Sequence, residues 1–203
     1  KITAYEGRAR LTGLGKVVVE GAERTDISAK HIVLATGSKP ATIRGVEFVA
    51  DRIGSSTEAL SYSEVPEHLV VIGAGYIGLE LGSVWQRLGA KVTVIEYLDR
   101  ILPGMDLELA REAEKVFKKQ GIEFRLGSKV VGATVEGNKC TVVIEGSAPI
   151  VCDRVLVSVG RTPNTTDIGL ETVSIVPDAR GYIPIDEHFA TAAPNIYAIG
   201  DIV

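Results

Sequence analysis

Apolar and polar residues alternate along the first 35 residues in the manner of β-strands. Glycine-containing turn signals interrupt the alternation at residues 13–15 and 21–22, and residues 31–35 form a short apolar run. Residues 36–66 are irregular, rich in proline and serine, and indicate a connection with one short helix. We therefore expect a small β unit that ends at a domain boundary within this connection.

The apolar run at residues 69–72 predicts a strand of a parallel sheet that is covered on both faces. A helix follows and ends at Gly89, and residues 92–95 predict the next strand. These three elements form a strand-helix-strand unit. The expected buried stripe of the helix consists of Ile77, Leu81, Val84 and Leu88.

A second helix is predicted to begin at Asp106, a favourable N-cap residue, and to end at Gly121. Its expected buried stripe consists of Leu109, Ala113 and Val116. Further strands are predicted at residues 122–126, 129–135, 140–145, 155–159 and 196–199. Alternating strands and helices followed by hairpins indicate an α/β fold.

The turn after the first apolar strand carries a glycine pattern. Gly73, Gly75 and Gly78 fit G-x-G-x-x-G between a buried strand and a helix, and the acidic residue Glu96 follows close to the expected 20 or so positions later. The bland alternative is a glycine turn that merely packs a helix against a strand. The complete context favours a dinucleotide-binding turn.

Each part of this pattern has a chemical role. Gly73 permits the tight turn, Gly75 lets the backbone approach a pyrophosphate, and Gly78 lets the helix pack closely on the strand. The N-terminus of the helix attracts phosphate. Glu96 can accept hydrogen bonds from the ribose hydroxyls and would repel a 2′-phosphate, so we predict NAD rather than NADP. Arg100 is the nearby cation that could reverse this preference; its ordinary role would be a surface ion pair.

Charge and hydropathy exclude several kinds of partner. The net charge is −4, with 22 basic and 26 acidic residues, and no basic cluster is evident. No apolar run has the roughly 18–20 residues that a membrane span needs. We expect neither nucleic acid nor membrane as a partner, and we recognise no signal peptide. We expect a cytoplasmic protein, or a protein of the mitochondrial matrix if the source is eukaryotic.

The two cysteines, Cys140 and Cys152, fall in predicted strands and lack the close spacing of a metal or redox motif. We expect two buried thiols in a reducing compartment, with a structural disulfide as the alternative. We identify no metal ligands and no catalytic residues. The chain begins at Lys1 and its only methionine is Met105, so we expect a piece of a longer protein.

Four segments, in order, resemble motifs of the pyridine nucleotide-disulphide oxidoreductases. They are residues 35–40, 71–80, 160–164 and 195–201. Within this family, residues 96–106 are most similar to the dihydrolipoamide dehydrogenases, whereas glutathione reductase-like relatives carry basic residues near the place of Glu96. Sister reductases that act on glutathione or mercuric ion, and the soluble transhydrogenases, are the alternatives.

The resemblance implies a Rossmann-like NAD-binding domain of three layers, with a parallel sheet and a β-meander, flanked by β remnants of an FAD domain. The implied domains are residues 1–61, a partial FAD-binding domain, residues 62–175, the NAD-binding domain, and residues 176–203, a returning segment of the FAD-binding domain. The implied NAD-binding residues are Gly73, Ala74, Gly75, Tyr76, Ile77, Gly78, Leu79, Glu80, Glu96, Val130 and Gly160. The implied FAD-binding residues are Ala9, Thr36, Gly37, Ser38 and Asp201.

The resemblance also implies an activity for the intact parent, a homodimeric flavoprotein oxidoreductase with a redox-active centre. The parent would oxidise dihydrolipoamide with NAD⁺ through FAD, and its partners would be the lipoyl domains of 2-oxoacid dehydrogenase complexes. The family's first FAD motif, redox disulfide and interface domain with a His-Glu pair have no counterpart in these 203 residues. We therefore expect the chain alone to be inactive. A dinucleotide-binding module without turnover is the alternative function.

Overall fold

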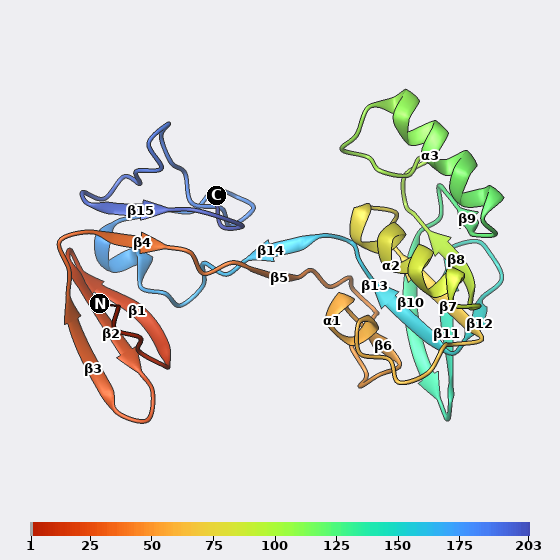
Figure 1. The fold of residues 1–203 in the computed structure, drawn as a ribbon, viewed down its shortest axis with the longest axis horizontal. Helices are drawn as coiled ribbons and strands as arrows, with labels where there is room; N and C mark the ends of the chain where they lie inside the picture. The colour runs from red at the N-terminus through yellow and green to blue at the C-terminus, as the bar shows by residue number, and fades with distance from the viewer. Residues whose placement is uncertain (1) are drawn as a thin grey trace. The chain divides into compact units, whose positions relative to one another are not determined.

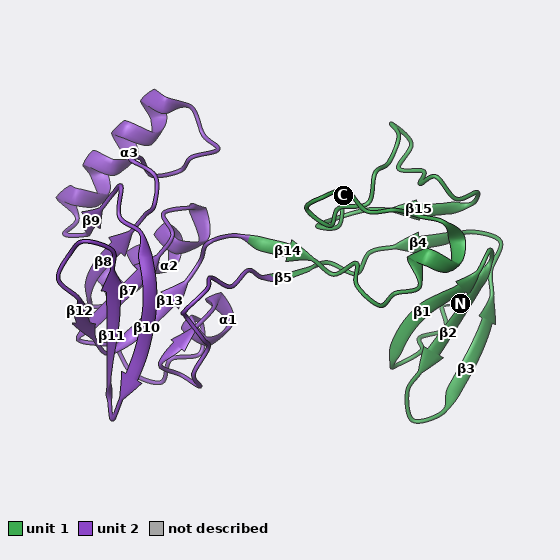
Figure 2. Cartoon of the chain, turned by 180° about the vertical axis from the view of Figure 1, so that it is seen from behind, with its two compact units in different colours: residues 1–39, 161–203 green, residues 40–160 purple. Residues whose placement is uncertain are grey.

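The computed structural model describes residues 2–203 and divides into two compact units (Figures 1 and 2). One unit is residues 40–160, and the other combines residues 1–39 with residues 161–203. These boundaries differ from the functional boundaries expected at residues 61 and 175. The difference arises because segments expected to connect the domains form strands. The strand β6 (Ile53–Gly54) pairs with β13 (Arg154–Val157), and β5 (Ser38–Pro40) pairs with β14 (Arg161–Pro163).

The larger unit is built on a five-stranded sheet with the order β6-β13-β7-β8-β9. All four pairings are parallel. Its central strands are β7 (His68–Ile72) and β8 (Lys91–Ile95), and its last strand is β9 (Glu123–Arg125). Parallel strands need crossover connections, and the helix between β7 and β8 provides one. The predicted strand-helix-strand unit is confirmed.

Three helices belong to this unit: α1 (Ser56–Ala59), α2 (Tyr76–Arg87) and α3 (Leu107–Lys119). The carboxylate of Asp106 caps α3 by accepting hydrogen bonds from two backbone N–H groups of its first turn, as expected of an N-cap aspartate. Both α2 and α3 are followed by a glycine with positive φ, Gly89 and Gly121. The predicted ends of the two long helices are therefore confirmed.

A three-stranded antiparallel meander forms the third layer. It consists of β10 (Val130–Glu136), β11 (Lys139–Ile144) and β12 (Ile150–Cys152). The side chains of β7 alternate between the layers: Leu69 and Val71 pack in the cluster that contains the helices, whereas Val70 and Ile72 pack in the cluster that contains the meander. The fold class is thus the expected three-layer α/β arrangement of parallel sheet and meander.

The expected buried stripes of the two long helices are confirmed only in part: Leu81 of α2 and Ala113 of α3 pack against the core, whereas other members are exposed. Val84 and Leu88 of α2 are largely exposed, and its fully buried residues are Gly78, Leu79, Gly82 and Trp85. In α3, Leu109 and Val116 are exposed, and Ala110 is the buried residue. The close contacts of α2 with the sheet are made at Gly78 and Gly82, which lie against Val71 of β7, and the large side chains of Leu79 and Trp85 fill the core beside them.

The smaller unit begins with an antiparallel meander of β1 (Arg8–Gly13), β2 (Lys16–Glu20) and β3 (Arg24–Ser28), as the alternating pattern predicts. The strand β4 (Ile32–Leu34) then pairs in parallel with β15 (Ile196–Ala198), which comes from the other end of the chain. A 3₁₀-helix, Leu170–Val173, contributes to the same core.

The core of this unit is a single cluster of buried residues drawn from both chain segments. Its members are Leu11, Ile32, Leu34, Leu170, Val173, Ile175, Ile183, Ala193, Ile196, Ala198 and Ile202. In the part of the chain that the structure describes, no helix has both the length and the apolar character to cross a membrane.

Candidate nucleotide-binding site

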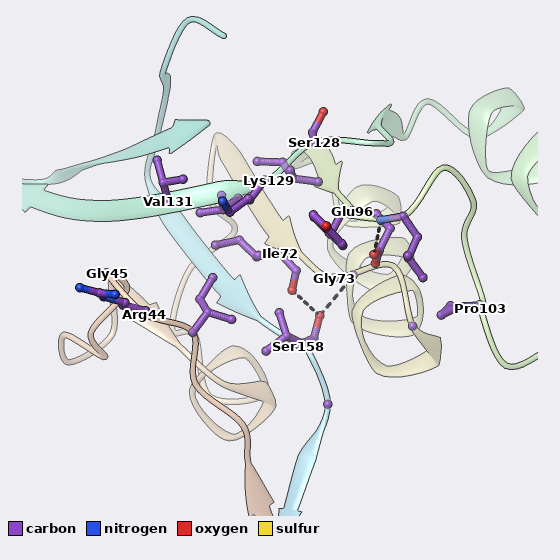
Figure 3. A pocket seen from close by; sticks show the side chains of 18 residues that line it. Arg44, Gly45, Ile72, Gly73, Glu96, Pro103, Ser128, Lys129, Val131 and Ser158 are labelled. Carbon is purple, nitrogen blue, oxygen red and sulfur yellow. Dashed lines mark hydrogen bonds between the residues drawn. The ribbon is translucent and has the colours of Figure 1, made fainter. Parts of the chain in front are cut away.

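A cavity of about 910 Å³ lies in the larger unit, where β7, β8 and β13 end (Figure 3). Ligands of open parallel sheets bind in the crevice outside the carboxyl ends of the strands. Five of the residues expected to bind NAD line this cavity: Gly73, Gly75, Glu96, Val130 and Gly160. The structure therefore brings together residues from four separate segments of the expected NAD site.

The glycine turn connects β7 to α2 at the wall of the cavity. Gly73 has φ +105, a conformation that favours glycine, and a β-carbon there would lie 2.5 Å from the carbonyl oxygen of Ser158. A β-carbon on Gly75 would meet no atom within 4 Å, so the space in front of this residue is open. Gly75 is the N-cap of α2, and within the described chain no side chain caps its N–H groups. The turn thus presents free backbone donors to the cavity, a favourable place for a phosphate.

Ser158, immediately after β13, ties the neighbouring strand to this turn. Its hydroxyl donates to the carbonyl oxygens of Ile72 and Gly73, at 3.1 and 3.2 Å (Figure 3). A β-carbon on Gly78 would lie 2.4 Å from both the Gly73 carbonyl oxygen and the Ser158 hydroxyl oxygen. Gly78 is therefore required for the close approach of α2 to β7 and β13.

Glu96 follows β8, and backbone donors hold its carboxylate in place. The oxygen Oε2 accepts from the N–H of Ala74 at 2.7 Å (Figure 3), and Oε1 accepts from the N–H of Leu98 at 2.9 Å. An ionised carboxylate offers about four acceptor positions. Two of them are used here, so the carboxylate is oriented and still able to accept two ribose hydroxyls.

Among residues 2–203, Arg100 has no acidic partner within ion-pair distance, so the surface ion pair expected as its ordinary role is not formed there. Its Nη2 atom donates to the carbonyl oxygens of Leu102 and Met105, at 3.2 and 2.5 Å. The side chain thus holds the loop that precedes α3.

Several other expected NAD residues lie beside the cavity wall rather than on it. Leu79 is buried in the core between α2 and the sheet, and Ala74 is also fully buried. Tyr76 is 70% exposed and Glu80 faces solvent, whereas Ile77 is half-buried. All five positions belong to the turn or to the first turns of α2, and of these residues only Ala74 and Leu79 belong to the core.

The cavity also contains residues that the sequence did not point to. Ser158 and Val159 could have been predicted from the sequence, because both directly follow a buried parallel strand, at the edge of the sheet where ligands bind. The segment Ile43 to Gly45 carries no chemical motif, and only its pairing beside β10 brings it to the cavity. The remaining unpredicted lining residues are Ile72, Ile95, Tyr97, Leu98, Pro103, Ser128, Lys129 and Val131.

In the smaller unit, the expected FAD residues form a hydrogen-bonded group. Ser38 donates from its hydroxyl to the carboxylate of Asp201 at 2.6 Å and accepts from Nε of Arg161 at 2.6 Å. Thr36 donates to the carbonyl oxygen of Asn164 at 2.7 Å, and Gly37 accepts from the Asn164 N–H.

The remaining expected FAD residue, Ala9, lies in β1 opposite Val19 and is exposed. It belongs to a different sheet of the smaller unit from the strands that border Thr36, Ser38 and Asp201. Its assignment to the flavin therefore depends on the family resemblance alone.

Comparison with protein-family models decides the family. The model of the pyridine nucleotide-disulphide oxidoreductases matches residues 1–203. The chain belongs to this family. Its glycine turn, oriented carboxylate and three-layer fold are therefore those of an oxidoreductase family that uses flavin and pyridine nucleotide.

Several curated relatives of this chain in the family are dihydrolipoyl dehydrogenases. The chain is 48% identical to dihydrolipoyl dehydrogenase 3 of Pseudomonas putida and 45% identical to the mitochondrial dihydrolipoyl dehydrogenase of Canis lupus familiaris. All of this chain is matched in both cases, but it covers only 45% and 42% of those proteins. The chain thus spans less than half the length of the relatives it matches.

Solved structures agree with this family. The chain superposes on LpdA from Mycobacterium tuberculosis with a TM-score of 0.90 at 27% identity, and on the flavoprotein disulfide reductase RclA from Escherichia coli, in its Cu(II) complex, with a TM-score of 0.89 at 29% identity. In each case 97% of this chain corresponds to 45% of the solved chain.

Proposed function

We propose that this chain binds NAD(H) in the cavity at the carboxyl ends of β7, β8 and β13, with Glu96 holding the adenosine ribose. The observation that carries the proposal is the carboxylate of Glu96, held between the N–H groups of Ala74 and Leu98 at the edge of an open glycine turn. The free N–H groups of α2 would receive the pyrophosphate. Val130 and Gly160 would lie on the nicotinamide side.

Titration calorimetry with NADH and NADPH tests this proposal directly. The chain should bind NADH more tightly than NADPH, because a 2′-phosphate would approach the Glu96 carboxylate. Glu96→Gln should weaken NADH binding by roughly 10- to 100-fold, since hydrogen bonds to a charged group contribute about 1.5–3 kcal/mol. The ratio between the dissociation constants for NADPH and NADH should be smaller in the same variant than in the unmodified chain.

A matched control is Glu136→Gln, which removes one carboxylate from the β10–β11 hairpin, outside the residues that line the cavity. This variant should bind NADH and NADPH with the same affinities as the unmodified 203-residue chain. Tighter binding of NADPH than NADH by the unmodified chain would contradict the proposed nucleotide preference. Equal losses in the two variants would contradict the role of Glu96.

For the intact protein we propose the oxidation of dihydrolipoamide by NAD⁺, through FAD. The proposal rests on the similarity to dihydrolipoyl dehydrogenases and on residues 96–106. The group of Thr36, Ser38 and Asp201 would hold FAD, which when bound transfers hydride to NAD⁺. Lipoyl domains would be the partners and a homodimer the assembly.

The 203-residue chain itself should have no such activity. It holds the NAD site but lacks the family's redox disulfide and His-Glu motif, so it fits the second candidate function, a dinucleotide-binding module without turnover. An assay of dihydrolipoamide oxidation with NAD⁺ and added FAD separates the two candidates. Turnover by this chain would refute the module, and NADH binding without turnover would support it.

A further inference from the structure

Cys140 and Cys152 face one another across two antiparallel strands of the larger unit. Cys140 lies in β11 and Cys152 in β12, and the register places the two residues directly opposite. Opposite residues project from the same face of a sheet, with β-carbons about 4.5–5.5 Å apart. The β-carbons of a disulfide are about 3.5–4.5 Å apart, so a small approach of the strands would allow the bond.

The surroundings of the pair fix both side chains in one place. The two residues are 0% and 2% exposed and belong to the core between the meander and the parallel sheet. The Sγ atom of Cys140 lies 3.6 Å from the carbonyl oxygens of Arg52 and Asp153. Both thiols are free. The close-packed core thus holds the two free thiols side by side without a covalent bond between them.

The electrostatics make the two thiols unequal. A hydrogen bond from the Cys152 thiol lowers the pKa of Cys140, and the nearby cations Arg52 and Arg154 act in the same direction, whereas burial and the carboxylate of Asp153 oppose them. The same hydrogen bond, together with burial, raises the pKa of Cys152. Cys140 is therefore the thiol that ionises first and reacts with an oxidant first.

We propose that Cys140 and Cys152 form a reversible disulfide when the protein meets a small peroxide. This inference does not rest on nucleotide binding. It assigns an oxidative modification site to the meander layer, with hydrogen peroxide as the class of oxidant. A peroxide suits the burial of the pair, because only a small molecule can reach the sulfurs during a limited opening of β12, the last and shortest strand of the meander.

The chemistry balances as follows. The Cys140 thiolate attacks one oxygen of hydrogen peroxide, the O–O bond breaks, and Cys140 becomes a sulfenic acid while one water is released after protonation. The Cys152 sulfur then attacks the Cys140 sulfur, the S–O bond breaks, and a second water leaves. Two thiols and one peroxide thus give one disulfide and two waters. A thiol reductant restores both thiols by exchange.

The disulfide would close the loop of residues 140–152 and join β11 covalently to β12. A bond of this kind stabilises a fold mainly by restricting the unfolded chain. Oxidation should therefore raise the Tm of the larger unit by roughly 5 °C or more, and reduction should reverse the shift. The Tm separates a native disulfide from oxidative damage, because damage to a buried thiol would lower it.

Intact mass spectrometry of the 203-residue chain after treatment with hydrogen peroxide tests the proposal. The chain should lose two hydrogens and regain them with a phosphine reductant, and a non-reduced digest should contain one peptide pair that links Cys140 to Cys152. Gain of oxygen without loss of hydrogens, or dimers linked between chains, would overturn the proposal. The unmodified chain is sufficient for this measurement.

Two single variants identify the order of reaction. In Cys152→Ala, peroxide should leave Cys140 as a sulfenic acid that a dione reagent traps. In Cys140→Ala, Cys152 should react much more slowly. If either variant fails to fold, a measurement on the unmodified chain takes the place of that variant. The rate at which peroxide consumes the thiols is then compared between the folded chain and the chain in denaturant. Trapping at Cys152 faster than at Cys140 would contradict the assigned order.

Discussion

His68, the first residue of β7, is held between two neighbouring strands. Its Nδ1 atom donates to the carbonyl oxygen of Val151 at 3.2 Å, and its Nε2 atom lies 2.9 Å from the hydroxyl oxygen of Thr93, which in turn lies 3.3 Å from Oε2 of Glu123. Burial lowers the pKa of His68, and Lys91 lowers it further, against smaller opposing effects of the hydrogen bond to Val151 and of the carboxylates of Glu123 and Asp153. The folded protein therefore favours the neutral ring.

The stability of the larger unit should decrease when the pH falls below about 6.5, the ordinary pKa of histidine. Above that pH both the folded and the unfolded chain carry neutral His68, so the contribution of His68 to the stability of the larger unit is fully present. Below it the unfolded chain binds a proton that the folded chain resists, and stability is lost until the pH passes the lowered folded pKa. Urea unfolding between about pH 7.5 and pH 5.5 measures the slope.

The control for this prediction is His68→Gln, whose amide can donate to Val151 but does not titrate. The carboxylates of the larger unit with lowered pKa values, Glu58 and Asp153, lose their contributions at lower pH, so the window above pH 5.5 isolates the histidine. The variant should show a flatter profile than the unmodified chain. Identical slopes would show that His68 does not control this part of the pH dependence.

At the scale of the element, two glycines one turn apart in α2 have different surroundings. A β-carbon on Gly78 would lie 2.4 Å from the Gly73 carbonyl oxygen, whereas a β-carbon on Gly82 would make ordinary contacts at 3.5 and 3.6 Å with Val92 and Val71. Gly78 thus sits at a contact with rigid backbone. Gly82 has room for a methyl group.

Gly78→Ala should destabilise the larger unit by about 1–3 kcal/mol, because the added methyl group overpacks the contact with the turn, and it should weaken NADH binding. Gly82→Ala is the matched control. It should leave NADH binding unchanged and should stabilise the unit by at most about 1 kcal/mol, the difference in helix propensity. Urea unfolding and NADH titration of both variants provide the measurements. Equal effects at the two positions would contradict the close-packing role of Gly78.

The same helix shows what the sequence could predict and what it could not. The existence and ends of α2 follow from the apolar strand before it and from Gly89 after it, since both signals are local. The buried face did not follow from apolar spacing, because Gly78 and Gly82 face the sheet while Val84 and Leu88 are exposed. The hydrophobic periodicity of a sequence reflects the positions of its large apolar residues. Close packing of a helix on a sheet favours small residues at the contact, which this pattern does not reveal.

The site divides in a similar way. Gly73, Gly75 and Glu96 were predictable because their roles depend on one contiguous strand-helix-strand unit. Ser158 joins the site through β13, which enters the sheet between β6 and β7. That strand order depends on contacts between distant segments. No local pattern in a single sequence reveals this strand order. The position of the segment from Ile43 to Gly45 could not be predicted for the same reason.

At the scale of the whole molecule, each compact unit has hydrophobic clusters of its own. The two clusters that contain β7 lie within residues 40–160, and the third cluster combines residues from 1–39 with residues from 161–203. The candidate nucleotide site lies entirely within residues 40–160. A ligand of that site therefore has direct contacts with only one of the two cores.

We expect differential scanning calorimetry to show two unfolding transitions, of which NADH shifts only one. A ligand that binds the folded state alone stabilises it by about 2.7 kcal/mol at 100 times its Kd, which corresponds to roughly 10 °C for a unit of this size. The transition of residues 40–160 should move, and that of the smaller unit should stay, because all residues that line the cavity belong to residues 40–160. Glu96→Gln should reduce the shift at the same NADH concentration. One transition that shifts as a whole would show that the two cores unfold as a single cooperative unit.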